Sequence, residues 1–136
     1  MSAKQGAPRG EQTVRTMAMP RDANWLGDIF GGWLMSHADI AGAIHAYRRA
    51  GGKVVTVAVD DFTFLQPVYV GDVVSFFCAL DQVGKSSLTV AVDIQAERAG
   101  APAGTLVPVA TARITYVHID DARRPRPVPV EPAVEV

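Results

Sequence analysis

The most regular feature of the hydrophobic pattern is an apolar segment at helical spacing, residues 31–50. Apolar side chains occupy nearly every side of this segment, which predicts a helix buried all round by other elements. Two glycines follow at 51 and 52, a common helix-stop signal. One carboxylate, Asp39, interrupts the apolar surface, and burying it ionised without a partner would cost several kcal/mol. The apolar members are Trp33, Leu34, Met35, Ala38, Ile40, Ala41, Ala43, Ile44 and Ala46.

After the helix the period changes to alternation with many β-branched residues, which is typical of strands. Tight turns separate these segments, so we expect neighbouring strands to be antiparallel. One helix with one antiparallel sheet predicts an α+β fold in which the sheet wraps around the helix. The exposed edges of so small a sheet also predict a homodimer paired edge to edge. The predicted strands are residues 13–19, ended by Pro20, and residues 53–65, 73–82, 86–98 and 105–119.

Composition and length indicate one soluble domain. The 136 residues are 49% hydrophobic and 20% charged, with a net charge of −1, and this length suffices for a single core. Near-neutral charge argues against a nucleic-acid partner bound through its phosphates. We therefore expect a flexible N-terminal arm at residues 1–12, a domain at 13–120, and an extended or disordered tail at 121–136.

Cysteine use and the N-terminus bear on the compartment. The single cysteine, Cys78, cannot form an intramolecular disulfide, which suits a reducing cytoplasm. The polar start MSAKQGAPRGEQ does not look like a signal peptide. No apolar run approaches the ~20 residues that span a bilayer. These observations predict a cytoplasmic protein without a membrane partner, with Cys78 as a buried strand residue.

The helix itself carries the candidate chemistry. Gly31 and Gly32 leave the backbone accessible at the start of the helix, where the first N–H groups lack helical acceptors. Such a helix start can stabilise developing negative charge. An acid and an anion-binding end are the components of a hydrolase. They stand eight residues apart, about 12 Å at ~1.5 Å per residue. Both could reach one carbonyl only if Gly31 lies in a turn that bends back, or if the two groups come from different chains.

Each of these residues also has a structural interpretation. Asp39 could be a hydrogen-bonded core carboxylate or part of an interfacial ion pair. The two glycines could serve tight packing. His37 and His45 are eight residues apart on the helix, too far to bind one metal ion, so we interpret both as structural and expect no metal site.

Four motifs occur in order along the chain: MPRDAN (19–24), GDIFGGWLMSHADIAGA (27–43), VVTVAVDDFTFLQPVYVGDVV (54–74) and VGKSSLTV (83–90). Together they resemble the hotdog-fold acyl-CoA thioesterases, in particular the bacterial short- to medium-chain acyl-CoA hydrolases that are similar to brain acyl-CoA hydrolase. The resemblance implies a sheet wrapped around a long helix and dimers with a continuous sheet. It also implies active sites between subunits and further assembly, often as trimers of dimers.

The resemblance further implies roles for three residues. Asp39 would be the catalytic acid/base or nucleophile, and the backbone N–H of Gly31 would polarise the thioester carbonyl. Asn24 would complete the site from the other subunit, although a loop asparagine can equally cap a turn. The implied reaction hydrolyses an acyl-CoA to free CoA and a carboxylic acid without a metal or redox cofactor.

Four more residues are candidates for substrate binding. Gly32 adjoins the anion-binding end of the helix, and Thr63 could hydrogen-bond in the site or be an ordinary strand residue. Lys85 and Ser86 could meet the CoA phosphates or form an ordinary hairpin turn. Two rival functions remain: a non-catalytic hotdog protein that binds acyl-CoA, and a hotdog dehydratase. The dehydratase would require a histidine paired with the acid, and the helix offers none on the face of Asp39.

Overall fold

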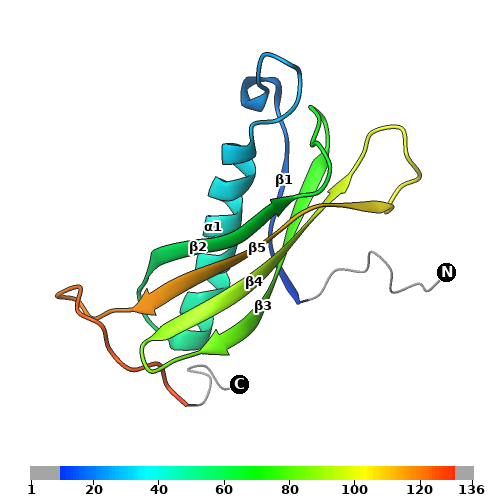
Figure 1. Cartoon of the computed structure of the whole chain (residues 1–136). Helices are drawn as coiled ribbons and strands as arrows, with labels where there is room; N and C mark the ends of the chain where they lie inside the picture. The colour runs from blue at the N-terminus through cyan, green and yellow to red at the C-terminus, as the bar shows by residue number, and fades with distance from the viewer. Residues whose placement is uncertain (1–9, 131–136) are drawn as a thin grey trace.

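The computed structural model describes residues 10–130. The chain folds into one long helix and five strands (Figure 1), as the pattern predicted. The first strand begins inside the predicted arm, because Glu11 already pairs with Cys78 in the register of the sheet. The elements are β1 Glu11–Met17, the short helix η1 Pro20–Asp22, α1 Gly31–Ala50, β2 Val54–Phe64, β3 Val73–Val83, β4 Ser87–Glu97 and β5 Leu106–His118.

The five strands form a single antiparallel sheet in the order β1-β3-β4-β5-β2. Helix α1 lies along one face of this sheet, and the strands cross it obliquely (Figure 1). The hairpin turns make β3, β4 and β5 neighbours, while β1 and β2 occupy the two edges. This is the hotdog arrangement that the sequence predicted.

The core lies between α1 and the inner face of the sheet. Small residues on the sheet side of the helix, Ala38, Ala41 and Ala46, are fully buried and let the helix approach the strands closely. Cys78 is a free, buried thiol within this layer, which confirms its predicted place. The strand residues that face the helix are Val74, Phe76, Leu88, Val90, Val92, Ile94, Ala110, Ile114 and Tyr116.

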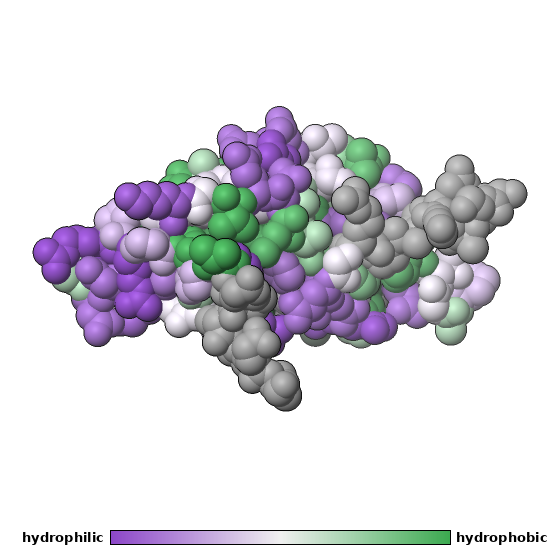
Figure 2. Space-filling view, turned by 90° about the horizontal axis from the view of Figure 1, so that it is seen from below, coloured by the Kyte–Doolittle hydropathy of each residue, from purple (hydrophilic) through white to green (hydrophobic). Residues whose placement is uncertain are grey.

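The prediction of a helix buried on all sides is wrong for a single chain. Met35, Ile40 and Tyr47 are 39%, 51% and 48% exposed on the side of α1 away from the core. The physical reason is that a five-stranded sheet covers one side of a helix only. Edge strand β2 likewise exposes apolar side chains, among them Val57 and Val59. Figure 2 shows the end of the molecule where α1 finishes, with a large group of hydrophobic residues near the centre of this face and smaller groups elsewhere among hydrophilic ones.

Residues 121–130 of the predicted tail are held against the domain by hydrogen bonds. Arg49 of α1 donates hydrogen bonds to the carbonyl oxygens of Pro129 and Val130 at 2.7 and 3.0 Å. The N–H of Val128 donates to the Lys85 oxygen at 2.8 Å. The remainder of the predicted arm and tail, residues 1–9 and 131–136, lies outside the described residues. Within residues 10–130 no helix is long and apolar enough to cross a membrane.

Candidate active site

Asp39 lies in the middle of α1, half-buried, on the side that faces edge strand β2. The hydroxyl of Thr56 on β2 donates a hydrogen bond to Asp39 Oδ1 at 2.6 Å. A hydrogen bond this short to a carboxylate is a charge-assisted one, and it fixes the orientation of the acceptor. Within one chain Asp39 is therefore a hydrogen-bonded, half-buried carboxylate. It is an oriented carboxylate on the apolar side of the helix that the chain leaves uncovered.

Thr56 is a site residue that sequence reasoning missed. Its contact with Asp39 depends on the register of β2 against β5 and on the rotation of the helix, neither of which the sequence pattern specifies. The available signal was weak, since Thr56 belongs to the same quoted motif as Thr63 and both are strand threonines.

Asn24 lies in the loop between η1 and α1, where it organises the turn. Its Oδ1 accepts hydrogen bonds from the N–H groups of Leu26 and Asp28, at 2.8 and 3.2 Å. Its own N–H donates to the Asp28 carbonyl oxygen at 2.7 Å, and Gly27 permits the turn with a φ of 97°. The structural interpretation of Asn24 as a turn residue is therefore correct for its oxygen. The side-chain NH₂ group is the part that a catalytic role would use.

Gly31 is the first residue of α1 and follows Phe30 at the N-cap. Among residues 10–130 no side chain caps this helix start, so its first N–H groups keep their capacity to bind an anion. The ring of Phe64 lies over Gly31, and a Cβ there would be 3.0 Å from its Cζ. Gly32 is exposed beside it, with open space where a Cβ would be.

The loop and the helix start share one groove of about 400 Å³. Asn24, Gly31 and Phe64 line it, together with Leu65, Gln66 and Pro67 after β2. The structure thus brings Asn24 and Gly31 together. Asp39 does not line this groove. Because α1 is a regular helix from Gly31 onward, the idea that Gly31 bends back toward Asp39 is wrong, and the two remain separated by two turns.

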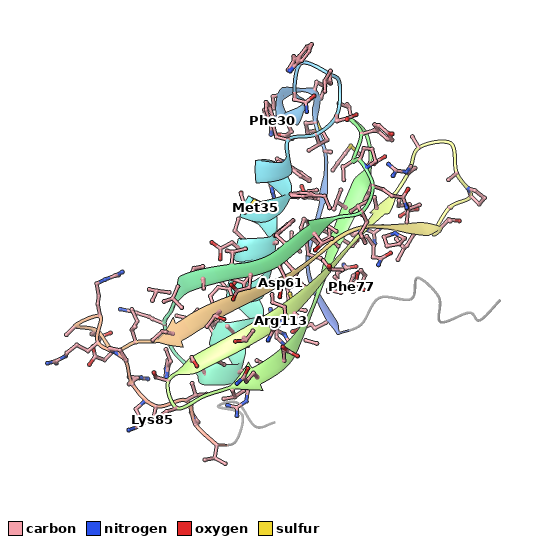
Figure 3. The ribbon with its side chains drawn as sticks, in the orientation of Figure 1. Phe30, Met35, Asp61, Phe77, Lys85 and Arg113 are labelled. Atoms are coloured by element: carbon pink, nitrogen blue, oxygen red, sulfur yellow. The ribbon has the colours of Figure 1, made fainter. Side chains whose placement is uncertain are left out.

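Thr63 is not near the acid in this chain. It pairs with Thr111 of β5 on the outer face of the sheet, where it lines a second hollow of about 370 Å³ with Asp61 and Arg113. Figure 3 shows Asp61 and Arg113 over the middle of the sheet, away from Phe30 at the start of the helix. Thr63 therefore does not meet Asp39 within one chain, and its predicted contact in the site stays a prediction. The physical reason is that alternate strand residues point to opposite faces.

Lys85 and Ser86 form the turn between β3 and β4 at the far end of the molecule. Figure 3 places Lys85 at the opposite end from Phe30. The carbonyl oxygens of Lys85 and Ser86 accept hydrogen bonds from the N–H groups of Val128 and His118, both at 2.8 Å. The turn thus helps to hold the tail, and the exposed Lys85 ammonium is free to meet an anion.

The helix histidines have structural partners, as expected. His37 Nδ1 lies 2.9 Å from the Trp33 carbonyl oxygen, and its ring packs between Trp33 and Phe76. His45 Nδ1 lies 2.8 Å from Glu11 Oε1, so it joins α1 to β1. Neither imidazole pairs with Asp39, and the dehydratase-type pairing of a histidine with the acid is not formed within this chain's described residues.

Comparisons with known proteins agree with this geometry. A family model described as the thioesterase superfamily matches residues 26–103. The acyl-CoA thioester hydrolase YciA of Escherichia coli (strain K12) is 45% identical over 132 residues, which is 96% of this chain and 100% of the relative. The crystal structure of the hexameric thioesterase y2039 from Yersinia pestis has a TM-score of 0.84 and 48% identity, covering 90% of this chain and 98% of that one.

A more distant solved relative bears on the site. The acyl-CoA hydrolase of Staphylococcus aureus, solved with butyryl coenzyme A and coenzyme A, has a TM-score of 0.79 and 32% identity, covering 85% of this chain and 70% of that one. Structures of its alanine variants replace an asparagine, an aspartate and a threonine. The spacing of those three residues along that chain is the spacing of Asn24, Asp39 and Thr56 here. By sequence, fold and the spacing of these side chains, the chain belongs to the thioesterase superfamily.

Proposed function

We propose that this protein hydrolyses acyl-CoA thioesters to free CoA and a carboxylic acid. The observation that carries the proposal is the carboxylate of Asp39, held by Thr56 at 2.6 Å on an uncovered apolar side of the helix. Thioester hydrolysis needs an activated water or a carboxylate nucleophile, and a half-buried, oriented aspartate can serve as either. The names of the relatives at 45% identity support the same substrate class.

The active site is formed by two copies of the chain. Gly31 and Asp39 stand about 12 Å apart along one straight helix, so a single chain cannot place both on one carbonyl group. Across a two-fold axis, Asp39 and Thr56 of one protomer can face Gly31 and Asn24 of the other. The exposed apolar side chains on α1 and along the edge of β2 support this pairing, because large uncovered apolar patches mark interfaces. The hexameric Yersinia relative supports further assembly into a hexamer.

In the resulting site each group has a chemical task. The thioester oxygen accepts a hydrogen bond from the N–H of Gly31, where the positive end of the helix stabilises the developing oxyanion. Asp39 takes a proton from water as the new C–O bond forms, and the proton passes to the CoA sulfur as the C–S bond breaks. Alternatively the Asp39 carboxylate attacks the carbonyl carbon, the C–S bond breaks and CoA leaves as a thiolate. Water then hydrolyses the resulting mixed anhydride to the free acid and the Asp39 carboxylate, and the proton released from water passes to the thiolate. The side-chain NH₂ of Asn24 orients the reacting group.

The other candidates belong to the binding of the CoA moiety. Lys85 is exposed at a turn and supplies a cation for a CoA phosphate, and Ser86 beside it offers a polar contact. Gly32 lies at the other end of the molecule, where it offers a backbone contact at the start of α1. We place the substrates among short- to medium-chain acyl-CoAs and the reaction in the cytoplasm. The free thiol of Cys78 is compatible with that reducing compartment.

A free-thiol assay over acyl-CoAs of increasing chain length tests the function. The proposal expects release of CoA-SH. Binding without release would identify a non-catalytic acyl-CoA-binding protein, and hydration of an enoyl-CoA without thiol release would identify a dehydratase. Asp39→Ala should lower kcat by at least ~10², the scale of a general acid–base group. A folded variant that keeps wild-type turnover would exclude the role of Asp39.

The two-copy site has its own test. Asp39→Ala and Asn24→Ala homomers should each be nearly inactive. Refolding them together in equal amounts should restore about a quarter of wild-type activity, because half the dimers are mixed and each mixed dimer has one intact site. If both groups acted from one chain, mixing would restore nothing.

A further inference from the structure

Tyr116 of β5 is the largest fully buried side chain among the described residues, with 0% exposure. Its hydroxyl donates a hydrogen bond to the main-chain oxygen of Asp39 at 2.7 Å. That oxygen is also the regular helical acceptor for the N–H four residues later. The tyrosine therefore adds a second hydrogen bond to this carbonyl, directed from the sheet. A buried hydroxyl needs such a partner, but helix α1 offers it at the one residue that carries the proposed catalytic carboxylate.

Gly42 makes room for this hydroxyl. A Cβ at residue 42 would overlap Tyr116 Oη and lie 3.0 Å from its Cζ. Glycine is an unfavourable residue inside a helix compared with alanine, and four alanines occupy other buried positions of α1. Residue 42 is therefore a glycine for a specific steric reason, because the Tyr116 hydroxyl occupies the space that an alanine methyl group would fill.

The sheet register joins this contact to the one on the carboxylate. Thr56 of β2 and Tyr116 of β5 are directly opposite in the antiparallel register. Thr56 donates to the carboxylate of Asp39 and Tyr116 to its main chain. One cross-strand pair therefore holds the same residue at two points. Any movement of the helix along the sheet would break both hydrogen bonds together.

We propose that Tyr116 is a positioning residue for the hydrolysis, whose hydroxyl fixes the main chain of Asp39 so that the carboxylate stays in register with Thr56. This inference rests on the proposed function of Asp39. Tyr116 does not act as an acid or base itself. Burial, and then the charge of Asp39, raise the pKa of Tyr116 far above its usual value, so the hydroxyl keeps its proton and donates at every working pH.

Tyr116→Phe is the direct test, because it removes the hydroxyl alone. The proposal expects kcat to fall about tenfold, within the range that small misplacements of a catalytic group produce. KM should stay within about twofold, since the lost contact does not touch the substrate. Tyr69→Phe is the matched control: it removes the same atom from an exposed ring under Arg98 and should leave kcat unchanged. Equal kcat for Tyr116→Phe and wild type would overturn the inference.

Two double variants separate positioning from general packing. In the Asp39→Ala background, adding Tyr116→Phe should leave the residual rate unchanged within about twofold, because its effect acts through the missing carboxylate. The same fractional loss in both backgrounds would overturn the proposal. In the double variant Gly42→Ala/Tyr116→Phe the alanine methyl group fills the space of the lost hydroxyl. This restores packing but not the hydrogen bond, so kcat should stay low even if the melting temperature returns to the wild-type value. Recovery of kcat to the wild-type value would show that only packing mattered.

Failure of the inference is distinguishable from failure of the proposed function. If the wild-type protein releases no CoA-SH from any acyl-CoA, the proposed function is wrong, and the inference fails with it. If the wild type is active and Asp39→Ala is not, while Tyr116→Phe turns over normally, only the role of Tyr116 is excluded.

Discussion

Replacing Thr56 by valine removes one hydroxyl from β2 and leaves a β-branched side chain of nearly the same shape. Strand propensity should be unaffected, because both residues favour strands. The change leaves Asp39 Oδ1 without the donor that lies 2.6 Å away in the wild type. It therefore perturbs the orientation of the carboxylate without changing its identity.

The magnitude follows from the kind of hydrogen bond. Hydrogen bonds to charged groups contribute ~1.5–3 kcal/mol. At about 1.4 kcal/mol per factor of ten, loss of the full contribution in the transition state corresponds to a ~10- to 150-fold lower kcat/KM. Thr56 is exposed in a single chain, so water can partly replace the donor. We expect a loss near the lower bound, about tenfold.

The assay is steady-state release of CoA-SH from a short-chain acyl-CoA by wild type, Thr56→Val and Thr56→Ser. Serine keeps the hydroxyl and should retain activity within about threefold, the difference that a freer rotamer produces. Urea unfolding of each variant establishes that the fold is intact. Wild-type kcat/KM in Thr56→Val, or equal losses in the serine and valine variants, would refute the argument that the hydroxyl orients Asp39.

Three further predictions concern stability and reactivity. Burial raises the pKa of the Cys78 thiol to about 11, so a disulfide reagent at neutral pH should label Cys78 only as the protein unfolds; rapid labelling of native protein would contradict this. Arg98 donates a hydrogen bond to the buried carboxylate of Asp72 at 2.7 Å. Arg98→Met should therefore lower the free energy of unfolding, measured by urea denaturation, by about 3 kcal/mol. A loss below about 1 kcal/mol, the scale of an exposed pair, would show that water replaces the arginine. The hydrogen bond with His45 is the main cause that lowers the pKa of Glu11 below its ordinary value of 4.5. The ionised Glu11 side chain therefore stabilises the folded protein above pH 4.5, and this stabilisation is lost as the pH falls through the folded-state pKa. Glu11→Gln should therefore show a shallower loss of stability on acidification, and equal acid slopes in both proteins would exclude the effect.

The fold was predictable because its signals are local. Alternation between apolar and β-branched residues specified the strands, and the turns between them specified antiparallel neighbours. The boundary at Glu11 was missed because its reason is tertiary: Glu11 Oε1 lies 2.8 Å from His45 Nδ1 on α1, and Oε2 accepts a hydrogen bond from Arg48. A polar residue next to a Gly- and Pro-containing arm carries no local sign of such contacts.

The candidate site was predictable only in part, for the same reason. Asp39 stands out in the sequence because a lone carboxylate in an apolar helix demands an explanation. Thr56 and Tyr116 do not stand out, because strand threonines and tyrosines are ordinary. Their relation to Asp39 arises from the β2–β5 register, which places both on the inner face, and the same alternation sends Thr63 to the outer face.

The separation of Gly31 and Asp39 connects the proposed catalysis to the proposed assembly. On one straight helix the oxyanion donor and the carboxylate cannot meet. Two helices related by a two-fold axis perpendicular to them run antiparallel, and such a pair can place the start of one beside the middle of the other. The side chains at that crossing would be those that a single chain leaves exposed, among them Met35 and Ile40. The apolar surface that drives two copies together is thus the surface that completes the site, so an enzyme built this way has no active monomer.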